Sequence, residues 1–118
     1  LGRIRHLPLI NSWDNEARSK SERQSINAPI QSTLSDMMML AMAELHEQYP
    51  DLWCFGMTHD DCGFYVPEHE AMLWATRVKE VMENLPLKKL FGWSPQVKFE
   101  ADAELGYENL AYLESVKF

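Results

Sequence analysis

The sequence predicts an α+β fold in which helices cover one face of a small antiparallel sheet with a central β-hairpin. Within residues 53–66, two short apolar runs rich in aromatic residues flank a polar centre, a pattern typical of a hairpin. Segments before and after it carry apolar residues three or four positions apart, as amphipathic helices do. Such elements bury one face each and favour a layered domain. With 118 residues, 46% of them hydrophobic, we expect residues 1–118 to form a single domain.

The N-terminal residues alternate between apolar and basic types. This pattern over residues 2–7 predicts a short strand that ends at Pro8. The chain opens at Leu1 without a lead-in, so we expect it to continue a larger structure, as part of a longer chain or of a split protein. Turn-forming residues 11–15 follow, and residues 16–26 have helical composition.

Pro29 predicts an interruption of the helical pattern, because proline disfavours the α conformation in the residue before it. We expect the first helix to stop or kink there and a second helix to run from about Ile30 to Gln48. Its methionines at helical spacing are interpreted as core residues. The apolar positions that define its buried face are Leu34, Met37, Met38, Ala41, Met42 and Leu45.

The chain after the hairpin predicts a third helix from about Glu68 to Asn84. Residues 86–95 are typical of a loop with apolar anchors, and residues 96–102 alternate like a strand. A terminal helical turn is expected over residues 107–113. The expected buried positions of the third helix are Met72, Ala75, Val78, Val81 and either Met82 or Leu85.

Composition restricts the class of protein. No apolar run reaches 18 residues and no basic-then-apolar leader is present, so we expect neither a membrane span nor a secretory signal, and a cytoplasmic location. Cys54 and Cys62 match no zinc or redox spacing and are expected to be reduced, buried thiols. The net charge of −7 argues against nucleic acid as a partner. The charge is uneven, however, because residues 1–33 hold five basic and three acidic side chains, and residues 34–118 hold six and fifteen.

The polar centre of the hairpin is His59-Asp60-Asp61. Adjacent carboxylates at a hairpin tip suit Mg²⁺, which takes oxygen ligands and often only one or two protein carboxylates. Adjacent strand residues point to opposite faces, so both reach one ligand only if the turn re-aims one of them. A solvated turn explains the pattern equally well.

A second polar set consists of Arg23, Asn27 and Gln31, which are spaced at i, i+4 and i+8. This spacing places three hydrogen-bonding side chains on nearly one line of a helix surface. Such a row suits the minor groove of a duplex, where the acceptors are similar for every base pair. An ordinary solvated helix face is the alternative.

Three strings together, in this order and spacing, resemble the C-terminal palm of family A DNA polymerases, the group of bacterial polymerase I and phage replicases. The resemblance covers residues 1 to about 85 well and continues loosely to the end. The strings are Gly2-Arg3-x-Arg5-x-Leu7-Pro8, Glu22-Arg23-x-x-x-Asn27-Ala28-Pro29-x-Gln31-x-Thr33-x-x-Asp36, and x-His59-Asp60-Asp61.

The resemblance implies roles for both polar sets. Asp60, and with it Asp61, would help to hold the two Mg²⁺ ions of template-directed nucleotidyl transfer, together with an aspartate from an upstream strand. His59 would touch the primer end. The row of Arg23, Asn27 and Gln31 would hydrogen-bond the minor groove of the primer–template, so the implied partners are primer–template DNA and a deoxynucleoside triphosphate.

Some features of the family differ or are missing. Asp61 stands where the family usually has Glu, Ser32 where it usually has Gly, and residues 106–109 match its Gly-x-x-Trp pattern only approximately. Neither an aspartate-bearing strand before the Arg23 helix nor an Arg-x-x-x-Lys helix for the triphosphate is found. We therefore expect this chain to be inactive by itself and to need the remaining polymerase segments, in the same chain or in a partner.

Two other functions remain open from the sequence. One is a non-catalytic nucleic-acid or protein interaction module derived from a polymerase. The other is a metal phosphohydrolase of the His-Asp type, built on His59 and Asp60. That chemistry needs further histidine ligands on helices, whereas His46 and His69 are expected near helix ends.

Overall fold

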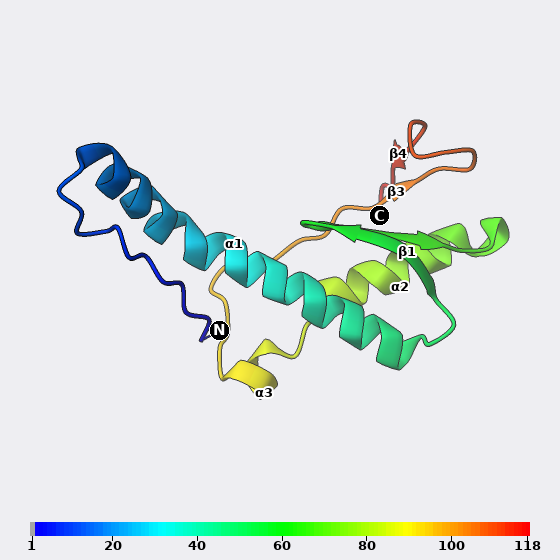
Figure 1. The fold of residues 1–118 in the computed structure, drawn as a ribbon. Helices are drawn as coiled ribbons and strands as arrows, with labels where there is room; N and C mark the ends of the chain where they lie inside the picture. The colour runs from blue at the N-terminus through cyan, green and yellow to red at the C-terminus, as the bar shows by residue number, and fades with distance from the viewer. Residues whose placement is uncertain (1) are drawn as a thin grey trace. The chain divides into compact units, whose positions relative to one another are not determined.

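The computed structural model describes residues 2–118, and Leu1, where the predicted N-terminal segment begins, lies outside them. The chain has two compact units, Leu1–Met37 and Met38–Phe118, each of which is described by itself. Helices and two small antiparallel sheets confirm the α+β fold (Figure 1). In chain order the elements are α1 (Asn15–Gln48), β1 (Trp53–Thr58), β2 (Asp61–Tyr65), the 3₁₀ helix η1 (Glu68–Glu70), α2 (Ala71–Glu83), α3 (Leu87–Phe91), β3 (Glu104–Leu105) and β4 (Glu114–Ser115).

The strand predicted over residues 2–7 is wrong. These residues have no regular secondary structure, and turns follow, in which the N–H of Ile10 donates to the carbonyl of Leu7 at 3.2 Å. The side chain of Ile4, which the alternation would place on a buried face, is 79% exposed. An alternating pattern forms a strand only where a neighbouring strand supplies hydrogen bonds, and in the described part of the chain none pairs with this segment.

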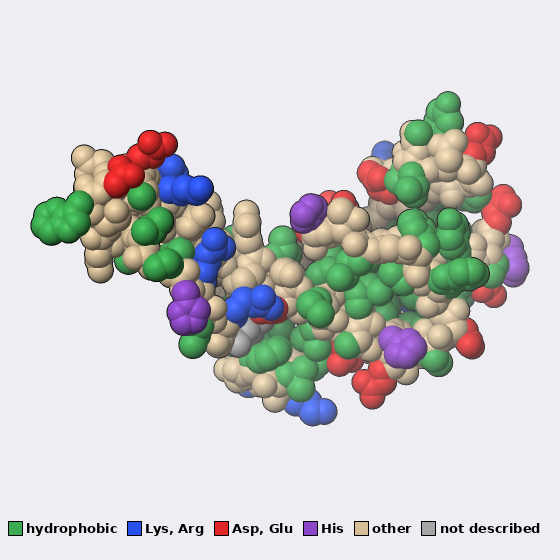
Figure 2. Space-filling model, in the orientation of Figure 1, with side chains coloured by type: hydrophobic (Ala, Val, Ile, Leu, Met, Phe, Trp, Pro, Cys, Tyr) green, Lys and Arg blue, Asp and Glu red, His purple; other side chains and the backbone are tan. Residues whose placement is uncertain are grey.

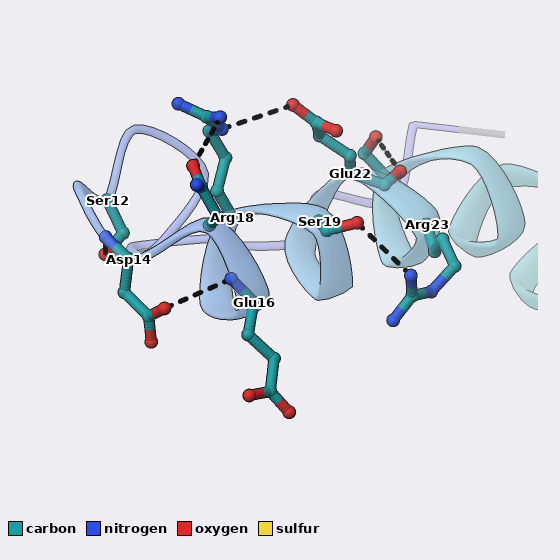
Figure 3. Close-up of polar contacts among 9 residues, drawn as sticks. Ser12, Asp14, Glu16, Arg18, Ser19, Glu22 and Arg23 are labelled. Carbon is teal, nitrogen blue, oxygen red and sulfur yellow. Dashed lines mark hydrogen bonds and ion pairs between the residues drawn. The ribbon is translucent and has the colours of Figure 1, made fainter.

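Helix α1 begins close to its predicted start, and the side chain of Asp14 satisfies one of its first N–H groups. The carboxylate of Asp14 accepts a hydrogen bond from the N–H of Glu16 at 3.1 Å, and the hydroxyl of Ser12 accepts one from Asp14 at 3.2 Å (Figure 3). Acceptors at this position replace the carbonyl partners that the first turn of a helix lacks.

The helix stop expected at Pro29, with a separate second helix after it, is wrong, because α1 continues through Pro29. A proline inside a helix removes one hydrogen bond and costs about 3 kcal/mol. On both sides of Pro29, serine hydroxyls donate to carbonyls of the helix: Ser25 to Glu22 at 2.6 Å, and Ser32 to Ala28. The penalty for one residue is smaller than the gain from the helical residues on either side.

The predicted buried face of α1 is confirmed in its C-terminal half. In the second unit Met38, Ala41 and Leu45 are buried and Met42 is half-buried, and Met37 is buried in the first unit. Leu34 was expected on the same face but is 42% exposed. The core interpretation of the methionines therefore holds for Met37 and Met38, and not for the neighbouring Met39.

The hairpin of the second unit is confirmed, with α2 along one face of it (Figure 1). A small, mainly apolar cavity of about 90 Å³ is lined by Phe64 of β2, by side chains of α2 and by residues 101–105. The end of α1 contacts α2 through an edge-to-face pair of Tyr49 and Trp74, whose ring centroids lie 5.3 Å apart. The guanidinium of Arg77 lies 5.0 Å from the Trp74 ring.

The predicted third helix is present as η1 and α2, and its buried face is partly confirmed. Val81 is buried, whereas Met72 is 51% exposed and Ala71 is buried in its place. The 3₁₀ helix η1 has fewer residues per turn than an α-helix. Side chains of α2 therefore point in other directions than a single α-helix from Glu68 would give them. None of the helices within residues 2–118 combines the length and the apolar character that crossing a bilayer requires.

The strand predicted over residues 96–102 is wrong. Side chains of α2 bind the backbone there: Glu83 accepts a hydrogen bond from the N–H of Ala101 at 3.0 Å, and Lys79 donates to the carbonyl of Ala101. The ammonium of Lys79 also lies 2.8 Å from the Glu83 carboxylate. Once side chains satisfy these backbone groups, they are not available to a strand ladder.

The end of the chain also differs from its prediction. Residues 107–113 form no helix but connect β3 to β4, which pair antiparallel. The side chain of Asn109 accepts a hydrogen bond from the N–H of Ala111 at 2.9 Å, which stabilises a turn. A five-residue helix, α3, occupies part of the segment predicted as a loop.

We expect Leu45→Ala to destabilise the second unit by about 2–5 kcal/mol, because it removes a fully buried side chain that is 1% exposed. Urea unfolding followed by far-UV circular dichroism measures this loss. Met39→Ala is the control, since Met39 lies on the same helix and is 59% exposed. Equal unfolding midpoints for the two variants would contradict the assigned core.

The Glu83 contacts predict a dependence of stability on pH. The hydrogen bond from Lys79, and then that from the N–H of Ala101, lowers the pKa of Glu83 below its ordinary value of 4.5. A lowered folded-state pKa stabilises the fold above the unfolded-state pKa, and this contribution is lost as the pH falls through the folded-state value. Glu83→Gln should therefore destabilise the protein at pH 7 and progressively less as the pH falls below the ordinary value of 4.5. Thermal unfolding midpoints at pH 7 and at a pH below 4 measure this difference. The control Glu80→Gln should have the midpoint of the original protein at each pH.

Candidate metal and nucleic-acid sites

The turn of the β1–β2 hairpin is only two residues long, His59 and Asp60. Thr58 pairs with Asp61, so Asp61 is the first residue of β2 and lies outside the turn itself. Two-residue hairpin turns need positive φ angles, and His59 has a φ of 51°. Histidine is among the few side chains enriched in this left-handed region. The hairpin therefore holds Asp60 at its tip by local geometry alone.

Asp60 and Asp61 are both exposed. Asp60 follows His59 in the turn, and Asp61 is paired with Thr58 in the strand ladder. The two carboxylates are therefore attached to different types of backbone, a turn and a strand. Their oxygens are the donor type that Mg²⁺ prefers. Within residues 2–118 no three His, Cys, Asp or Glu side chains converge on a point that suits a metal ion. The donor set fits one part of an Mg²⁺ site, to which other ligands must be added.

Cys54 and Cys62 are free thiols, as expected, but they are half-buried and not fully buried. Cys54 lies opposite Phe64 in the hairpin, and Cys62 lies opposite Met57. Burial, followed by the nearby Cys54 and Asp61, raises the pKa of the Cys62 thiol to about 11. A thiol with a raised pKa is mostly protonated at neutral pH and is a poor nucleophile.

One face of the hairpin carries exposed aromatic side chains. Trp53 and Tyr65 pair across the strands and are 69% and 65% exposed, with ring centroids 6.0 Å apart. The Phe55 ring covers Gly63, where an added Cβ would lie 2.2 Å from the ring. Figure 2 shows the hydrophobic side chains on the surface of this unit. An apolar surface of this kind is typical of an interaction site.

The first unit contains a wide hollow of about 850 Å³ between α1 and the N-terminal segment. Asn27 and Gln31, both exposed and both in the predicted row, line it from the helix side. Arg5 and His6 line it from the N-terminal segment. Figure 2 shows Lys and Arg side chains along this unit. The hollow thus combines amide donors and acceptors with a cation, which suits a polar, negatively charged ligand.

Arg23, the third member of the row, is not among the described residues that line the hollow. Its guanidinium donates to the Ser19 hydroxyl at 3.3 Å, one turn earlier in α1 (Figure 3). Arg23, Asn27 and Gln31 still follow one line of a continuous helix, as their spacing predicts. Asn27 and Gln31 therefore line the same hollow, whereas Arg23 lies outside its lining and binds Ser19.

The sequence interpretation gave no role to several residues of the hollow. Arg5 and Asp36 were noticed only as parts of the family-like strings, and Gln24 and His6 were not singled out. The Arg3 guanidinium donates to Asp36 from Nε at 3.2 Å and also from Nη2. The available signal was the basic Gly-Arg-x-Arg string, but its partner lies 33 residues away and is brought close only by folding.

The profile of the family described as DNA polymerase family A matches residues 1–111. The chain belongs to this family. The DNA polymerase I, thermostable, of Thermus thermophilus is 32% identical over 112 residues, which are 93% of this chain and 13% of that protein. The DNA polymerase of Bacillus phage SP01 is 33% identical over 89 residues, 71% of this chain and 10% of its own length. The DNA polymerase I of Bacillus subtilis is 32% identical over 102 residues, 79% and 12% of the two chains.

The chain spans about one tenth of the length of these family A relatives. No solved structure matches it significantly. The family membership agrees with the resemblance noted in the sequence, and the carboxylates of the hairpin and the polar row both lie within the matched residues. The individual roles of these residues remain predictions.

Proposed function

We propose that this family A chain is a palm portion of a DNA-dependent DNA polymerase and acts in template-directed nucleotidyl transfer. The hairpin supports this best, because its two-residue turn presents Asp60 at an exposed tip, within the part of the chain that matches the family. Residues 1–118 would then form one palm-like fragment, the single domain expected from the sequence. Its predicted location is the cytoplasm of a bacterium, or of a host cell if a phage encodes it.

Asp60 is the proposed metal ligand, with Asp61 as a second carboxylate whose shorter side chain replaces the usual glutamate. When bound, two Mg²⁺ ions supply charge stabilisation and a more acidic primer 3′-hydroxyl. His59 is proposed to contact the primer end from the same turn. The protein's own contribution is to hold these groups in a fixed backbone geometry before the DNA arrives.

Asn27 and Gln31 are proposed to hydrogen-bond the minor groove of the primer–template, with Arg23 at the end of the same row. Amide side chains both donate and accept, so they suit acceptors that every correct base pair presents in a similar place. The exposure of Asn27 and Gln31 and their position in the hollow support this role. The acidic total charge then requires most of the phosphate-binding cations to lie elsewhere in the polymerase.

The remaining polymerase segments are proposed partners, in the same chain or as a separate one. They would supply the first metal aspartate and the residues that bind the deoxynucleoside triphosphate, and without them the chain would be inactive. The exposed aromatic face of the hairpin supports the need for such partners. Duplex binding without any extension after full reconstitution would favour a non-catalytic interaction module. Stoichiometric binding of a transition metal by the isolated chain would favour a His-Asp phosphohydrolase.

In the complete enzyme, Asp60→Ala should lower the rate of primer extension by at least about 100-fold, because metal charge stabilisation contributes several kcal/mol. Primer–template affinity should change little, since the role proposed for Asp60 is to bind the metal ions and not the duplex. Single-turnover extension and fluorescence-anisotropy binding measure the two quantities. Full extension activity in this variant would refute the metal role.

Two variants control this experiment. Asp51→Ala removes an exposed carboxylate from the turn before β1 and should leave extension unchanged. Asp61→Glu restores the residue usual in the family and should keep or raise activity if Asp61 serves the metals. A rate as low as that of Asp60→Ala would show that this position at the start of β2 does not tolerate the longer side chain.

Asn27→Ala and Gln31→Ala should each weaken primer–template binding about fivefold, because one hydrogen bond contributes about 1 kcal/mol. Extension from a mismatched primer end should be less strongly disfavoured in both variants. Dissociation constants and extension rates from matched and mismatched ends test this. Gln48→Ala, an exposed glutamine at the end of α1, should behave like the original protein. Unchanged affinity and discrimination in both test variants would exclude the minor-groove role.

A further inference from the structure

We propose that the Arg3–Asp36 pair is a positioning device that holds residues 2–7 beside α1 and presents Arg5 to a phosphate of bound duplex DNA. The inference rests on the proposed function, because the duplex must lie against the hollow that Asn27 and Gln31 line. Arg3 and Asp36 act through Arg5 and need no DNA contact of their own.

The geometry of the pair supports a positioning role. The guanidinium of Arg3 donates from Nε to one carboxylate oxygen of Asp36 at 3.2 Å and from Nη2 to the other. A two-pronged contact of this kind fixes orientation as well as distance. The side chain of Asp36 is 22% exposed and that of Arg3 is 55% exposed.

Within residues 2–118, the two bonds of this pair are the only hydrogen bonds between residues 2–7 and α1. The other bonds of the segment lie in its own turns, such as that between Ile10 and Leu7. Residues 2–7 have no strand or helix that would place them otherwise. Loss of the Arg3–Asp36 pair should therefore release the segment from the helix.

Arg5 is two residues from the anchored Arg3, and an extended backbone keeps them within about 7 Å of each other. It lines the same hollow as Asn27 and Gln31. Among the described residues Arg5 forms no ion pair, whereas Arg3 is neutralised by Asp36. Arg5 therefore offers its charge to a ligand next to the amide row, and phosphate is the anion that a duplex presents beside its minor groove.

The test uses the complete enzyme and measures primer–template affinity at several NaCl concentrations. Each phosphate contact adds about 0.9 to the slope of log affinity against log salt. Arg5→Ala should reduce the magnitude of this slope by about one. An unchanged slope would overturn the phosphate contact.

The positioning role is tested by combining variants. If Asp36 acts only as a carboxylate near DNA, Asp36→Asn should tighten binding, and Arg5→Ala should still reduce the slope in that background. If Asp36 positions Arg5, Asp36→Asn should lower the slope by itself, and adding Arg5→Ala should change it by less than half of its effect in the original protein. An undiminished effect of Arg5→Ala would overturn the positioning role.

Further variants separate positioning from misfolding. The double exchange of Arg3→Asp and Asp36→Arg reverses the charges but keeps the pair. In this background, adding Arg5→Ala should again reduce the salt slope by most of the amount seen in the original protein. Glu16→Gln removes one negative charge from an exposed residue of the same unit and should leave the slope unchanged. Each variant should retain the far-UV circular dichroism of the original protein. Failure of the exchange to restore any of the effect, in a folded protein, would count against the pair.

The outcomes also separate this inference from the proposed function. If the original enzyme does not bind primer–template, or if Asp60→Ala extends primers normally, the proposed function fails. If the enzyme binds and extends but the salt slope does not respond to Arg5 and Asp36 as described, only the positioning inference fails.

Discussion

The two-residue turn between β1 and β2 is the constraint on which the candidate metal site depends. Because Thr58 pairs with Asp61, the chain must reverse over His59 and Asp60 alone, and His59 takes a left-handed conformation to do so. Left-handed backbone is uncommon for residues other than glycine, and it is found often at functional sites. The turn, together with the pairing of β1 and β2, fixes the backbone of Asp60.

The same exposure that makes the tip accessible also limits what it can do by itself. Water screens an exposed carboxylate and weakens its hold on a cation, so a functional Mg²⁺ site needs more ligands and a drier setting. The hairpin also leaves Trp53 and Tyr65 largely exposed on one face. Both features agree with the proposal that other polymerase segments complete the site and cover this face.

The first unit shows how side chains replace secondary structure as the means of placing a segment. Residues 2–7 form neither helix nor strand, yet the Arg3–Asp36 pair links them to α1. In the second unit, Lys79 and Glu83 of α2 bind the backbone of Ala101 in the same way. In both places an alternating sequence predicted a strand, and long-range polar contacts decided otherwise. Periodicity reports which side chains resemble each other, not which backbone groups find partners.

The spacing of apolar residues and the motifs were enough to predict the α+β class, the hairpin, the helices on either side of it and the family. These features depend on local pattern, and a short polar turn between apolar runs has few conformations open to it. Long-range folding settled that α1 passes through Pro29, that Asp61 belongs to the strand, and that Asn27 and Gln31 share a hollow with Arg5. The reason is physical, because a proline penalty of about 3 kcal/mol is weighed against a whole helix. A contact between residues more than 20 positions apart cannot be predicted from the local residue pattern around either of them.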